Sequence, residues 1–272
     1  MTQEATGYIM MGNESSAELR RLRGLELILD PNTEALLTRC PDLLGRKCLE
    51  VGAGAGSVTT HLLSLVGSDG DVLAVDIDTT FLDEQAGYGI LKSDINSLSE
   101  SFDGSFDLVH ARAVIEHTVE PEQTLMRVSR LVRPGGSLLV EALVVPGENI
   151  VAEDDPVGPA RKAVHDRMTG LGTDSGIDFL FGYRVPWLLG SYGLEVLHSE
   201  IHGTIFQGGD ERADFYRISF DYLKDLFLAD GTVTSESLNS YVESASTADH
   251  FQQGPLILAT LASRSLDRSW GS

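Results

Sequence analysis

Three glycines at alternate positions follow an acidic side chain near the start of the chain. Glu50 precedes Gly52, Gly54 and Gly56, and a short apolar segment that includes Leu49 leads up to them. Glycine lets a backbone turn tightly and approach a ligand closely. The spacing matches neither the G-x-G-x-x-G dinucleotide fingerprint nor a P-loop. Because a carboxylate repels a pyrophosphate, the pattern favours a phosphate-free ligand that carries an ammonium group. The simpler alternative is a buried Glu50 that caps a turn.

Further carboxylates follow apolar segments at positions where a nucleoside could bind. Asp76 comes 20 residues after the last of these glycines and can accept hydrogen bonds from both ribose hydroxyls. Alternatively, it caps a following helix, a role that suits Asp78 better. Asp94 can accept from an adenine amino group while Ile95 packs on the ring. S-adenosylmethionine (SAM), with an adenosine, a sulfonium and an amino-acid end, fits this set of side chains.

The composition narrows the class of ligand and the compartment. The 272 residues include 41 Asp and Glu against 20 Lys and Arg, a formal net charge of −21, which repels nucleic-acid phosphates and anionic membranes. Cys40 and Cys48 make no disulfide framework, so we expect a cytoplasmic protein. The polar N-terminus is unlike a signal peptide, and no apolar segment approaches the roughly 20 residues of a membrane span. No His, Cys and Asp cluster has metal-ligand spacing, so we expect no metal.

Strands and helices alternate through the first half of the chain. Apolar periodicity predicts strands at 47–51, 71–78, 88–91, 106–110 and 137–141, and helices at 58–66 and 122–132. This alternation implies a parallel sheet with right-handed crossovers. Before it, leucines at helical spacing predict a helix from residue 17 that stops at 30–33, and a second helix at 34–39.

The second half is less regular. Residues 146–178, rich in Gly, Pro and Asp, are expected to form an insertion near the mouth of the site. The pattern then predicts a helix from Gly182 with Pro186 in its first turn, a strand at 194–201, a helix with an apolar stripe over 215–227, a helix at 235–246 and a last strand at 256–262. We therefore divide the chain into an N-terminal helical lid (1–39), a SAM-binding core (40–145) and the remainder of the same sheet (146–272), with substrate-binding helical insertions at 146–178 and 207–250.

Four motifs stand in a recognisable order and spacing. They are Leu-Glu-Val-Gly-Ala-Gly-Ala-Gly-Ser at 49–57, Val-Asp-Ile-Asp at 75–78, Phe-Asp-Leu-Val-His-Ala-Arg at 106–112 and Leu-Val-Arg-Pro-Gly-Gly at 131–136. Over residues 18–142 the chain resembles the class I SAM-dependent methyltransferases. It is most similar to bacterial small-molecule enzymes of secondary metabolism, which tend to carry an Arg-Leu-Arg helix like residues 21–23. The resemblance implies an α/β, Rossmann-like fold: a seven-stranded, mostly parallel sheet with an antiparallel last strand and helices on both faces.

The resemblance also suggests which residues bind the cofactor and the acceptor. For SAM these are Glu50, Gly52, Ala53, Gly54 and Ser57 around the methionine end, Asp76 and Ile77 at the ribose and adenine, Asp94 and Ile95 at the adenine, and Ala111 through its backbone. The N-terminal arginines are either a solvated face or part of the lid, from which Arg21 reaches the carboxylate end of SAM. For the acceptor we expect Tyr8, Arg112 and Tyr183. Lys92-Ser93 precedes Asp94 where many family members have a glycine.

Methyl transfer requires alignment of the acceptor with the sulfonium carbon and, for some acceptors, removal of a proton. Histidine suits the second task near neutral pH. His117, after the fourth strand, is the first candidate for a catalytic base; the alternatives are a helix cap or a cofactor contact. Glu141, at the tip of the fifth strand, is a candidate to orient the acceptor. His110 fits a satisfied core histidine, and His202 and Tyr183 are further candidates from the variable half.

The leading hypothesis is SAM-dependent methyl transfer to an oxygen, nitrogen or carbon atom of a small natural-product-like molecule. One alternative keeps SAM without the transfer, as in a SAM-binding cyclase, because a fold does not define a reaction. The other is an NAD-dependent oxidoreductase, against which Glu50 and the glycine spacing argue. We expect a small-molecule acceptor as the partner, no nucleic acid and no membrane, and leave open a homodimer.

Overall fold

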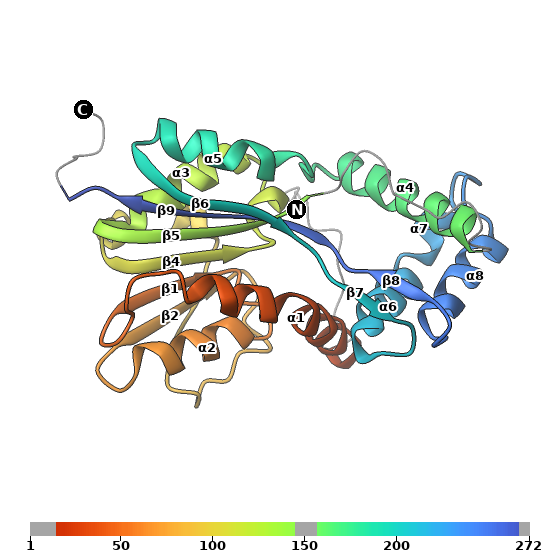
Figure 1. The fold of residues 1–272 in the computed structure, drawn as a ribbon, viewed down its shortest axis with the longest axis horizontal. Helices are drawn as coiled ribbons and strands as arrows, with labels where there is room; N and C mark the ends of the chain where they lie inside the picture. The colour runs from red at the N-terminus through yellow and green to blue at the C-terminus, as the bar shows by residue number, and fades with distance from the viewer. Residues whose placement is uncertain (1–14, 145–156, 267–272) are drawn as a thin grey trace, which may run out of the picture. The chain divides into compact units, whose positions relative to one another are not determined.

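The computed structural model describes residues 15–144 and 157–266 of the chain (Figure 1). The helices are α1 (Ser15–Leu37), α2 (Ser57–Val66), α3 (Pro121–Leu131), α4 (Gly158–Asp174), α5 (Phe181–Ser191), α6 (Asp214–Tyr222), α7 (Lys224–Leu228) and α8 (Ser235–Ala245). The strands are β1 (Lys47–Val51), β2 (Asp71–Asp76), β3 (Gly89–Lys92), β4 (Phe106–Arg112), β5 (Val132–Val144), β6 (Leu194–His202), β7 (Ile205–Gln207), β8 (Phe251–Gln253) and β9 (Leu256–Arg264). Short 3₁₀ turns are η1 (Ile95–Ser97), η2 (Glu100–Phe102), η3 (Ile115–His117) and η4 (Glu211–Ala213).

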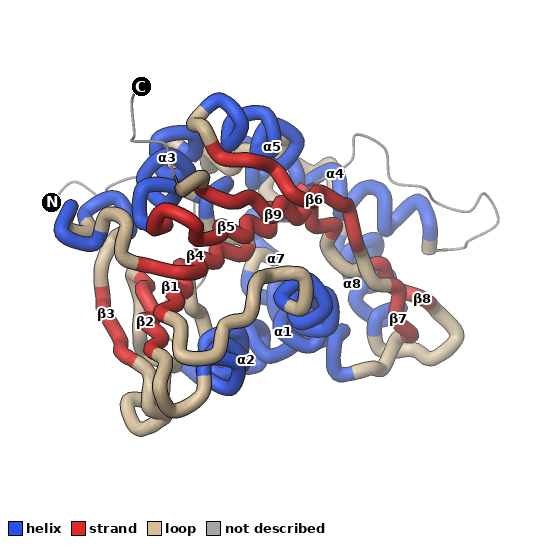
Figure 2. The backbone as a smooth tube through the Cα atoms, turned by 60° about the vertical axis from the view of Figure 1, so that its left-hand side comes forward, coloured by secondary structure: helices blue, strands red, loops and turns tan. Residues whose placement is uncertain are grey.

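Seven strands form one sheet in the order β3-β2-β1-β4-β5-β9-β6 (Figure 2). β1 pairs in parallel with β2 and β4, and further parallel pairs join β2 to β3 and β4 to β5. β9, the last strand in the chain, runs antiparallel to β6. The expected fold class, a Rossmann-like sheet that is mostly parallel with an antiparallel last strand, is thereby confirmed.

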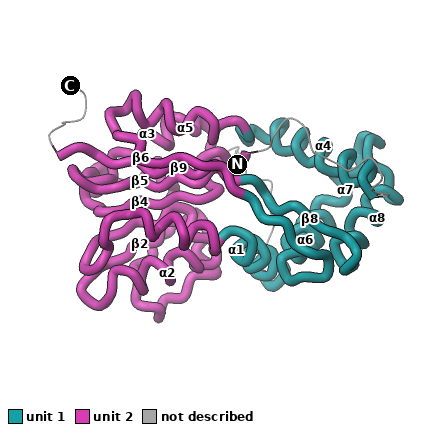
Figure 3. Tube along the Cα trace, in the orientation of Figure 1, with its two compact units in different colours: residues 1–29, 145–179, 203–256 teal, residues 30–144, 180–202, 257–272 magenta. Residues whose placement is uncertain are grey.

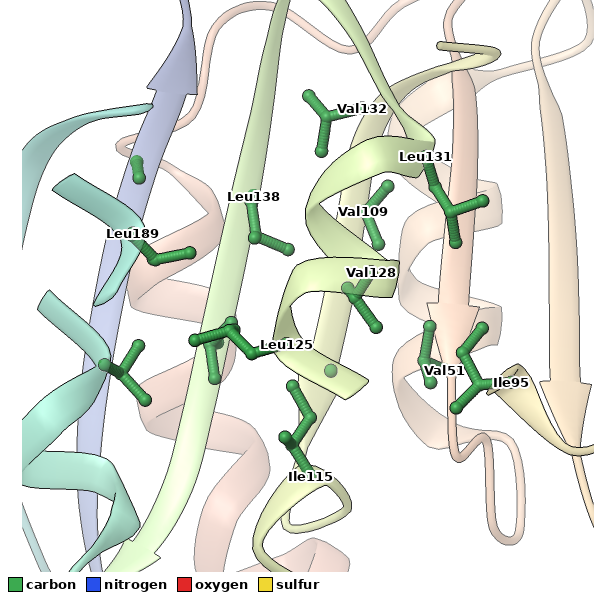
Figure 4. Close-up of a cluster of buried hydrophobic side chains, with 14 of the residues drawn as sticks. Val51, Ile95, Val109, Ile115, Leu125, Val128, Leu131, Val132, Leu138 and Leu189 are labelled. Atoms are coloured by element: carbon green, nitrogen blue, oxygen red, sulfur yellow. The ribbon is translucent and has the colours of Figure 1, made fainter. Parts of the chain in front are cut away.

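Helices cover both faces of this sheet because its central strands carry apolar residues on both sides. On one face, Leu125 and Val128 of α3 pack with Val109 and Leu138 of the strands (Figure 4), and α5 joins the same cluster. On the other face, α2 and the last residues of α1 cover a second cluster, which includes the buried Cys48. Parallel sheets buried on both faces read as near-continuous apolar segments, which is why these strands could be predicted.

Residues 15–37 form one helix, where the sequence predicts a stop at 30–33 and a second helix. Pro31 lies inside α1, although it has no N–H for the helical ladder and normally interrupts a helix. The side chains on both sides of the proline are anchored to the sheet, since Asp30 and Thr33 both accept hydrogen bonds from Arg112. These contacts offset the lost backbone bond, which sequence periodicity alone cannot reveal.

The second half departs further from the expected elements. α4 occupies residues expected only as an insertion, and its apolar residues do not gather on one helical face. The predicted apolar stripe forms two helices, α6 and α7, which separate at Leu223. Pro186 lies in the interior of α5, because that helix begins at Phe181. β7 and β8, which pair with each other, were not predicted.

The chain divides into two compact units, coloured separately in Figure 3. One contains residues 1–29, 145–179 and 203–256, and the other contains 30–144, 180–202 and 257–272. The second unit holds almost all of the seven-stranded sheet. The boundaries of the lid, the core and the insertions given above stay predictions. Within residues 15–144 and 157–266, no helix is both long and apolar enough to cross a membrane.

Candidate SAM-binding and methyl-transfer site

Strand alternation places four polar side chains on one face of the sheet. Glu50 of β1 is the register partner of His110 of β4, and Glu141 of β5 is the register partner of Arg112. Alternate residues of a strand point to the same face, so all four lie on the face that α2 and the end of α1 cover. They lie toward the carboxyl ends of three adjacent parallel strands, where α/β proteins bind their ligands.

The chain leaves β1 through a bend made of the three glycines. Gly52, Gly54 and Gly56 have φ angles of +71°, +57° and +88°, a left-handed conformation that glycine adopts without steric cost. The Gly52 N–H donates to the carbonyl of Val75 at 2.8 Å, and a Cβ on Gly52 would overlap Cγ2 of Val114. The loop after β4 therefore packs directly against the glycine bend.

Asp76 ties the tip of β2 to the same bend. Its Oδ2 accepts from the Gly54 N–H and its Oδ1 from the Asp78 N–H, both at 2.9 Å. Burial raises the pKa of Asp76, and the backbone N–H groups oppose that shift. Asp78 caps no helix, contrary to the expectation, and instead accepts from the backbone and hydroxyl of Thr80 in a turn. Asp76 thus presents a carboxylate beside the bend, as ribose binding requires.

A buried histidine links Glu50 to Glu141. His110 Nδ1 lies 2.6 Å from Glu50 Oε2, and His110 Nε2 lies 2.9 Å from Glu141 Oε1. Burial would lower the pKa of His110, but the charges and hydrogen bonds of the two carboxylates raise it to about 9. Burial alone would raise the pKa of Glu141, but His110, the adjacent His202 and Arg112 lower it to about 2. The raised pKa thus favours a protonated His110 ring, bonded to a carboxylate on each side, below the ends of the strands.

The end of α1 is anchored to this cluster. Arg112 donates to Asp30 and Thr33, each at 2.8 Å, and the Thr33 hydroxyl donates to Glu141 Oε2 at 3.1 Å. Ser57, at the start of α2, donates to Asp30 Oδ1 at 3.0 Å. Residues 30–37 are thus held over the sheet by side-chain bonds, so this part of the predicted lid is fixed in place.

The loop after β4 shows two features that often mark active sites. Ala113 has φ of +52°, a conformation that costs a non-glycine residue about 1–2 kcal/mol. Glu116 is buried, its Oε1 accepts from the Leu143 N–H at 2.6 Å, and burial raises its pKa to about 7. His117 follows it in η3. Strained backbone and shifted carboxyl pKa values gather at functional sites, so this loop is the natural place for acceptor chemistry.

Most of the predicted cofactor residues lie on β1, the bend, α2 and the tip of β2. These are Glu50, Gly52, Ala53, Gly54, Ser57 and Asp76. Ala111 is buried within β4, and Ile95 is buried in the core beside α3. Ile77 is 53% exposed, and Asp94 is exposed, with its side chain accepting from the Asn96 N–H at the start of η1.

Of the remaining predicted binding residues, one belongs to the other compact unit, one lies on the opposite face of the sheet and one is not described. Arg21 belongs to the other compact unit, where it bonds to Glu18 and its guanidinium lies 5.8 Å from the ring centre of Phe215. Tyr183 is exposed on α5, a helix that covers the opposite face of the sheet. Tyr8 lies outside the described residues. The binding role of each site residue stays a prediction.

The sequence alone does not reveal the contacts of His110. The residue is buried, as a core histidine would be, but both of its ring nitrogens are bonded to carboxylates. His202, at the end of β6, lies 3.5 Å from Glu141 through its Nε2. The period-two alternation of Glu50, His110 and Glu141 along neighbouring strands was the available signal. It becomes informative only when the register of the strands is known.

The hydrogen-bonding groups of this site fit SAM. The bend is shaped for close approach of a backbone, since Gly52 has no room for a Cβ, and two carboxylates, Glu50 and Asp76, flank it. Carboxylates accept from ammonium and hydroxyl groups, which SAM carries, and they repel the diphosphate of NAD. In the described part of the chain, no three His, Cys, Asp or Glu side chains are grouped to hold a metal ion; the absence of a metal stays a prediction.

Comparison with known proteins supports the same assignment. A family model described as a methyltransferase domain matches residues 49–140, which run from β1 into β5. The ubiquinone/menaquinone C-methyltransferase UbiE of Hahella chejuensis is 30% identical over 118 residues, covering 40% of this chain and 47% of that protein. The polyketide synthase verA of Penicillium polonicum is 32% identical over 129 residues, covering 40% of this chain and 5% of the synthase. The chain thus spans less than half of either relative.

Solved structures share the fold at low sequence identity. A Bacillus halodurans protein described as a methyltransferase has a TM-score of 0.57 at 15% identity, covering 86% of this chain and 99% of that one. Phosphoethanolamine N-methyltransferase 2 of Haemonchus contortus, solved with S-adenosylhomocysteine, has a TM-score of 0.52 at 17% identity, covering 86% and 52%. The [4+2]-cyclase SpnF has a TM-score of 0.52 at 16% identity, covering 87% and 81%.

The fold and the site define a Rossmann-like SAM-binding domain. Residues 49–140, which carry Glu50, Asp76 and His110, match a methyltransferase domain, so this part of the chain is a class I SAM-dependent methyltransferase domain. For this domain, the predicted family, an enzyme of this kind and its SAM cofactor are confirmed.

We expect Gly52→Ala to weaken SAM binding about tenfold, because overpacking costs about 1–3 kcal/mol and each 1.4 kcal/mol is roughly a factor of ten. The new Cβ forces Val114 or the bend to move. Gly45→Ala is the matched control, since Gly45 has φ of +70° but nothing within 4 Å of its Cβ position. Calorimetric titration of both variants separates backbone strain from the steric clash; equal SAM affinities would contradict the role of the bend.

Proposed function

We propose that this protein transfers the methyl group of SAM to an oxygen, nitrogen or carbon atom of a small natural-product-like molecule. The observation that carries the proposal is the pair of carboxylates, Glu50 and Asp76, at the tips of adjacent parallel strands with the glycine bend between them. One suits the ammonium of an amino acid and the other suits the two hydroxyls of a ribose.

In the proposed reaction SAM supplies a methyl group already activated on a sulfonium. The chain binds and orients it: Glu50 and the bend hold the methionine end, and Asp76 holds the ribose. The acceptor atom forms a bond to the methyl carbon as the carbon–sulfur bond breaks and its electrons pass to sulfur. Where the acceptor carries a proton, His117 takes it. Arg112, whose guanidinium is held by Asp30 and Thr33, is proposed to contact the acceptor.

The names of the relatives support the class of acceptor. One acts in ubiquinone/menaquinone biosynthesis as a C-methyltransferase, and another is a polyketide synthase, so aromatic rings and polyketide-like carbon chains are the acceptors to try first. A role in bacterial secondary metabolism accords with this choice. The net charge of −21 supports the further proposal that the protein binds neither nucleic acid nor membrane. The two cysteines support the proposal of a cytoplasmic location, and a homodimer is compatible with both.

Incubation with methyl-labelled SAM tests the proposal directly. Candidate acceptors are phenols, primary amines and enolisable diketones, which represent oxygen, nitrogen and carbon nucleophiles. Transfer of label to one class, together with S-adenosylhomocysteine, is the expected result. Calorimetry with SAM and with NAD provides the second arm. Tight binding of NAD without binding of SAM would instead favour an oxidoreductase.

A SAM-binding cyclase is the second candidate, because the cyclase SpnF shares this fold. Such a protein would leave SAM intact while an added polyene or similar substrate is rearranged. Mass spectrometry of the same incubations separates the two functions, since methyl transfer adds a carbon to the product and cyclisation leaves its mass unchanged.

Asp76→Ala is expected to weaken SAM binding by about 1–3 kcal/mol, because the ribose loses a charge-assisted hydrogen bond. Asp78→Ala is the matched control: Asp78 is a neighbouring carboxylate, but it is exposed and bonded to Thr80. Calorimetric dissociation constants measure both effects. The ribose role of Asp76 is refuted by an unchanged SAM affinity, or by an equal loss in the Asp78 variant.

A further inference from the structure

The carboxylate of Glu50 is held by a single buried side chain of the neighbouring strand. Glu50 and His110 are register partners on β1 and β4, and His110 Nδ1 lies 2.6 Å from Glu50 Oε2. The Glu50 and His110 side chains are 3% and 0% exposed, so water cannot take over this contact. The orientation of Glu50 thus depends on a residue whose own position is fixed from the other side by Glu141.

The hydrogen bonds require His110 to be protonated. A carboxylate only accepts hydrogen bonds, and both ring nitrogens of His110 face carboxylate oxygens, at 2.6 Å and 2.9 Å. With both carboxyls ionised, both nitrogens carry hydrogen and the ring is a cation, in accord with a His110 pKa raised to about 9. The cation also opposes the effect of burial on Glu50, whose pKa burial raises and His110 counteracts. His110 thus opposes the desolvation that raises the pKa of Glu50.

Other charged groups near His110 come from its own strand and from two further elements, α1 and β6. Arg112 lies on the same strand and is paired with Asp30 of α1, while His202 of β6 lies 3.5 Å from Glu141. Each of these reaches His110 only through Glu141 or through space, whereas Glu50 is bonded to it directly. One oxygen of Glu50 is thus occupied by His110, and the remaining lone pairs of the carboxylate can accept from a ligand.

We propose that His110 is a positioning residue for the cofactor: it holds the Glu50 carboxylate oriented toward the ammonium group of SAM. This inference rests on the proposed function, because it assumes that Glu50 meets the methionine end. His110 itself contacts neither SAM nor the acceptor. SAM affinity therefore depends on His110 only as long as Glu50 is a carboxylate.

A double-mutant cycle measures this dependence, because a residue that acts through another adds nothing once the other is changed. The four proteins are the wild type, Glu50→Gln, His110→Gln and the double variant, and the readout is the calorimetric dissociation constant for SAM. We expect His110→Gln to weaken SAM binding at least tenfold in the wild-type background and less than twofold in the Glu50→Gln background. His61→Gln, on α2 and away from the cluster, is the matched control and is expected to bind SAM as the wild type does.

A pH series provides a readout that a purely structural role would not move. The ammonium group of SAM itself loses its proton in the alkaline range. Wild-type affinity is therefore expected to fall more steeply through about pH 9, where His110 loses its proton, than the affinity of His110→Gln. In His110→Gln, the turnover measured at saturating SAM should differ from that of the wild type by less than threefold. If His110→Gln fails to fold by circular dichroism, the wild-type pH series and Glu50→Gln still decide.

The outcomes are distinguishable. No binding of SAM by the wild type refutes the proposed function and, with it, this inference. Binding of SAM by the wild type together with equal losses from His110→Gln in both backgrounds refutes the positioning role alone. A wild-type affinity that is constant through pH 9.5, or that falls identically in the Glu50→Gln variant, also refutes it.

Discussion

His117→Ala is expected to lower methyl-transfer turnover by about 10²–10⁴-fold, the usual loss when a general base is removed, and to leave the affinity for SAM unchanged. This expectation depends on where His117 lies in the fold. His117 closes the η3 turn, where its N–H donates to the carbonyl of Val114 at 3.1 Å, and Val114 packs against Gly52 of the cofactor bend. The imidazole is therefore carried by the loop that covers the bend. Steady-state kinetics with whichever acceptor class takes the label from SAM, alongside calorimetry with SAM, measures both quantities.

His61→Ala is the control for the loss of a histidine as such. His61 is a partly exposed residue of α2 whose nearest ionic partner, Glu34, lies 3.8 Å away, and its replacement should leave turnover as it is. Wild-type turnover in His117→Ala would show that alignment alone drives the transfer. A loss confined to SAM affinity would assign His117 to cofactor binding, the alternative that its position after the fourth strand also allows.

The strands and the glycine bend could be predicted because they depend on local chemistry. Leu49 and Val51 surround an acid and lead into glycines that need left-handed backbone, and such short-range patterns specify a strand and a turn without tertiary information. Asp76 was found for the same reason, because it ends the next apolar segment. The central half of the sheet therefore follows from segments of about six residues, the usual strand length, each read separately.

The buried charge cluster could not be predicted in this way. Whether His110 faces Glu50 or the opposite side of the sheet depends on the register between β1 and β4, and a shift of one residue would move it to the other face. Thr33 joins the cluster only because α1 continues through Pro31, against the local rule. Sequence periodicity carries no information on long-range contacts of this kind. It also does not predict α4, because the apolar residues of that helix follow no single face.

Glu141→Leu is expected to destabilise the protein by about 3–5 kcal/mol, the cost of breaking a buried ion pair by removing one partner. Leucine fills a similar volume, but His110 keeps one carboxylate instead of two and Thr33 loses the acceptor of its hydroxyl. Urea unfolding at pH 6 measures the free energy. Glu200→Leu is the matched control on β6: Glu200 is a partly exposed glutamate bonded to His198, and surface pairs contribute roughly 0–1 kcal/mol.

The pH dependence of this loss separates a charge effect from a packing effect. Glu141 has a pKa lowered from 4.5 to about 2 in the folded state, so its contribution is present above pH 4.5 and is lost as the pH falls through about 2. His110 has a pKa raised from 6.5 to about 9, so its contribution is present below pH 6.5 and is lost as the pH rises through about 9. The difference between wild type and Glu141→Leu should therefore be largest between pH 4.5 and 6.5 and shrink at alkaline pH. If the difference in unfolding free energy between wild type and Glu141→Leu is the same in this range as above pH 9, His110 is not the buried cation. The cost of a cavity or a repacked core does not depend on pH.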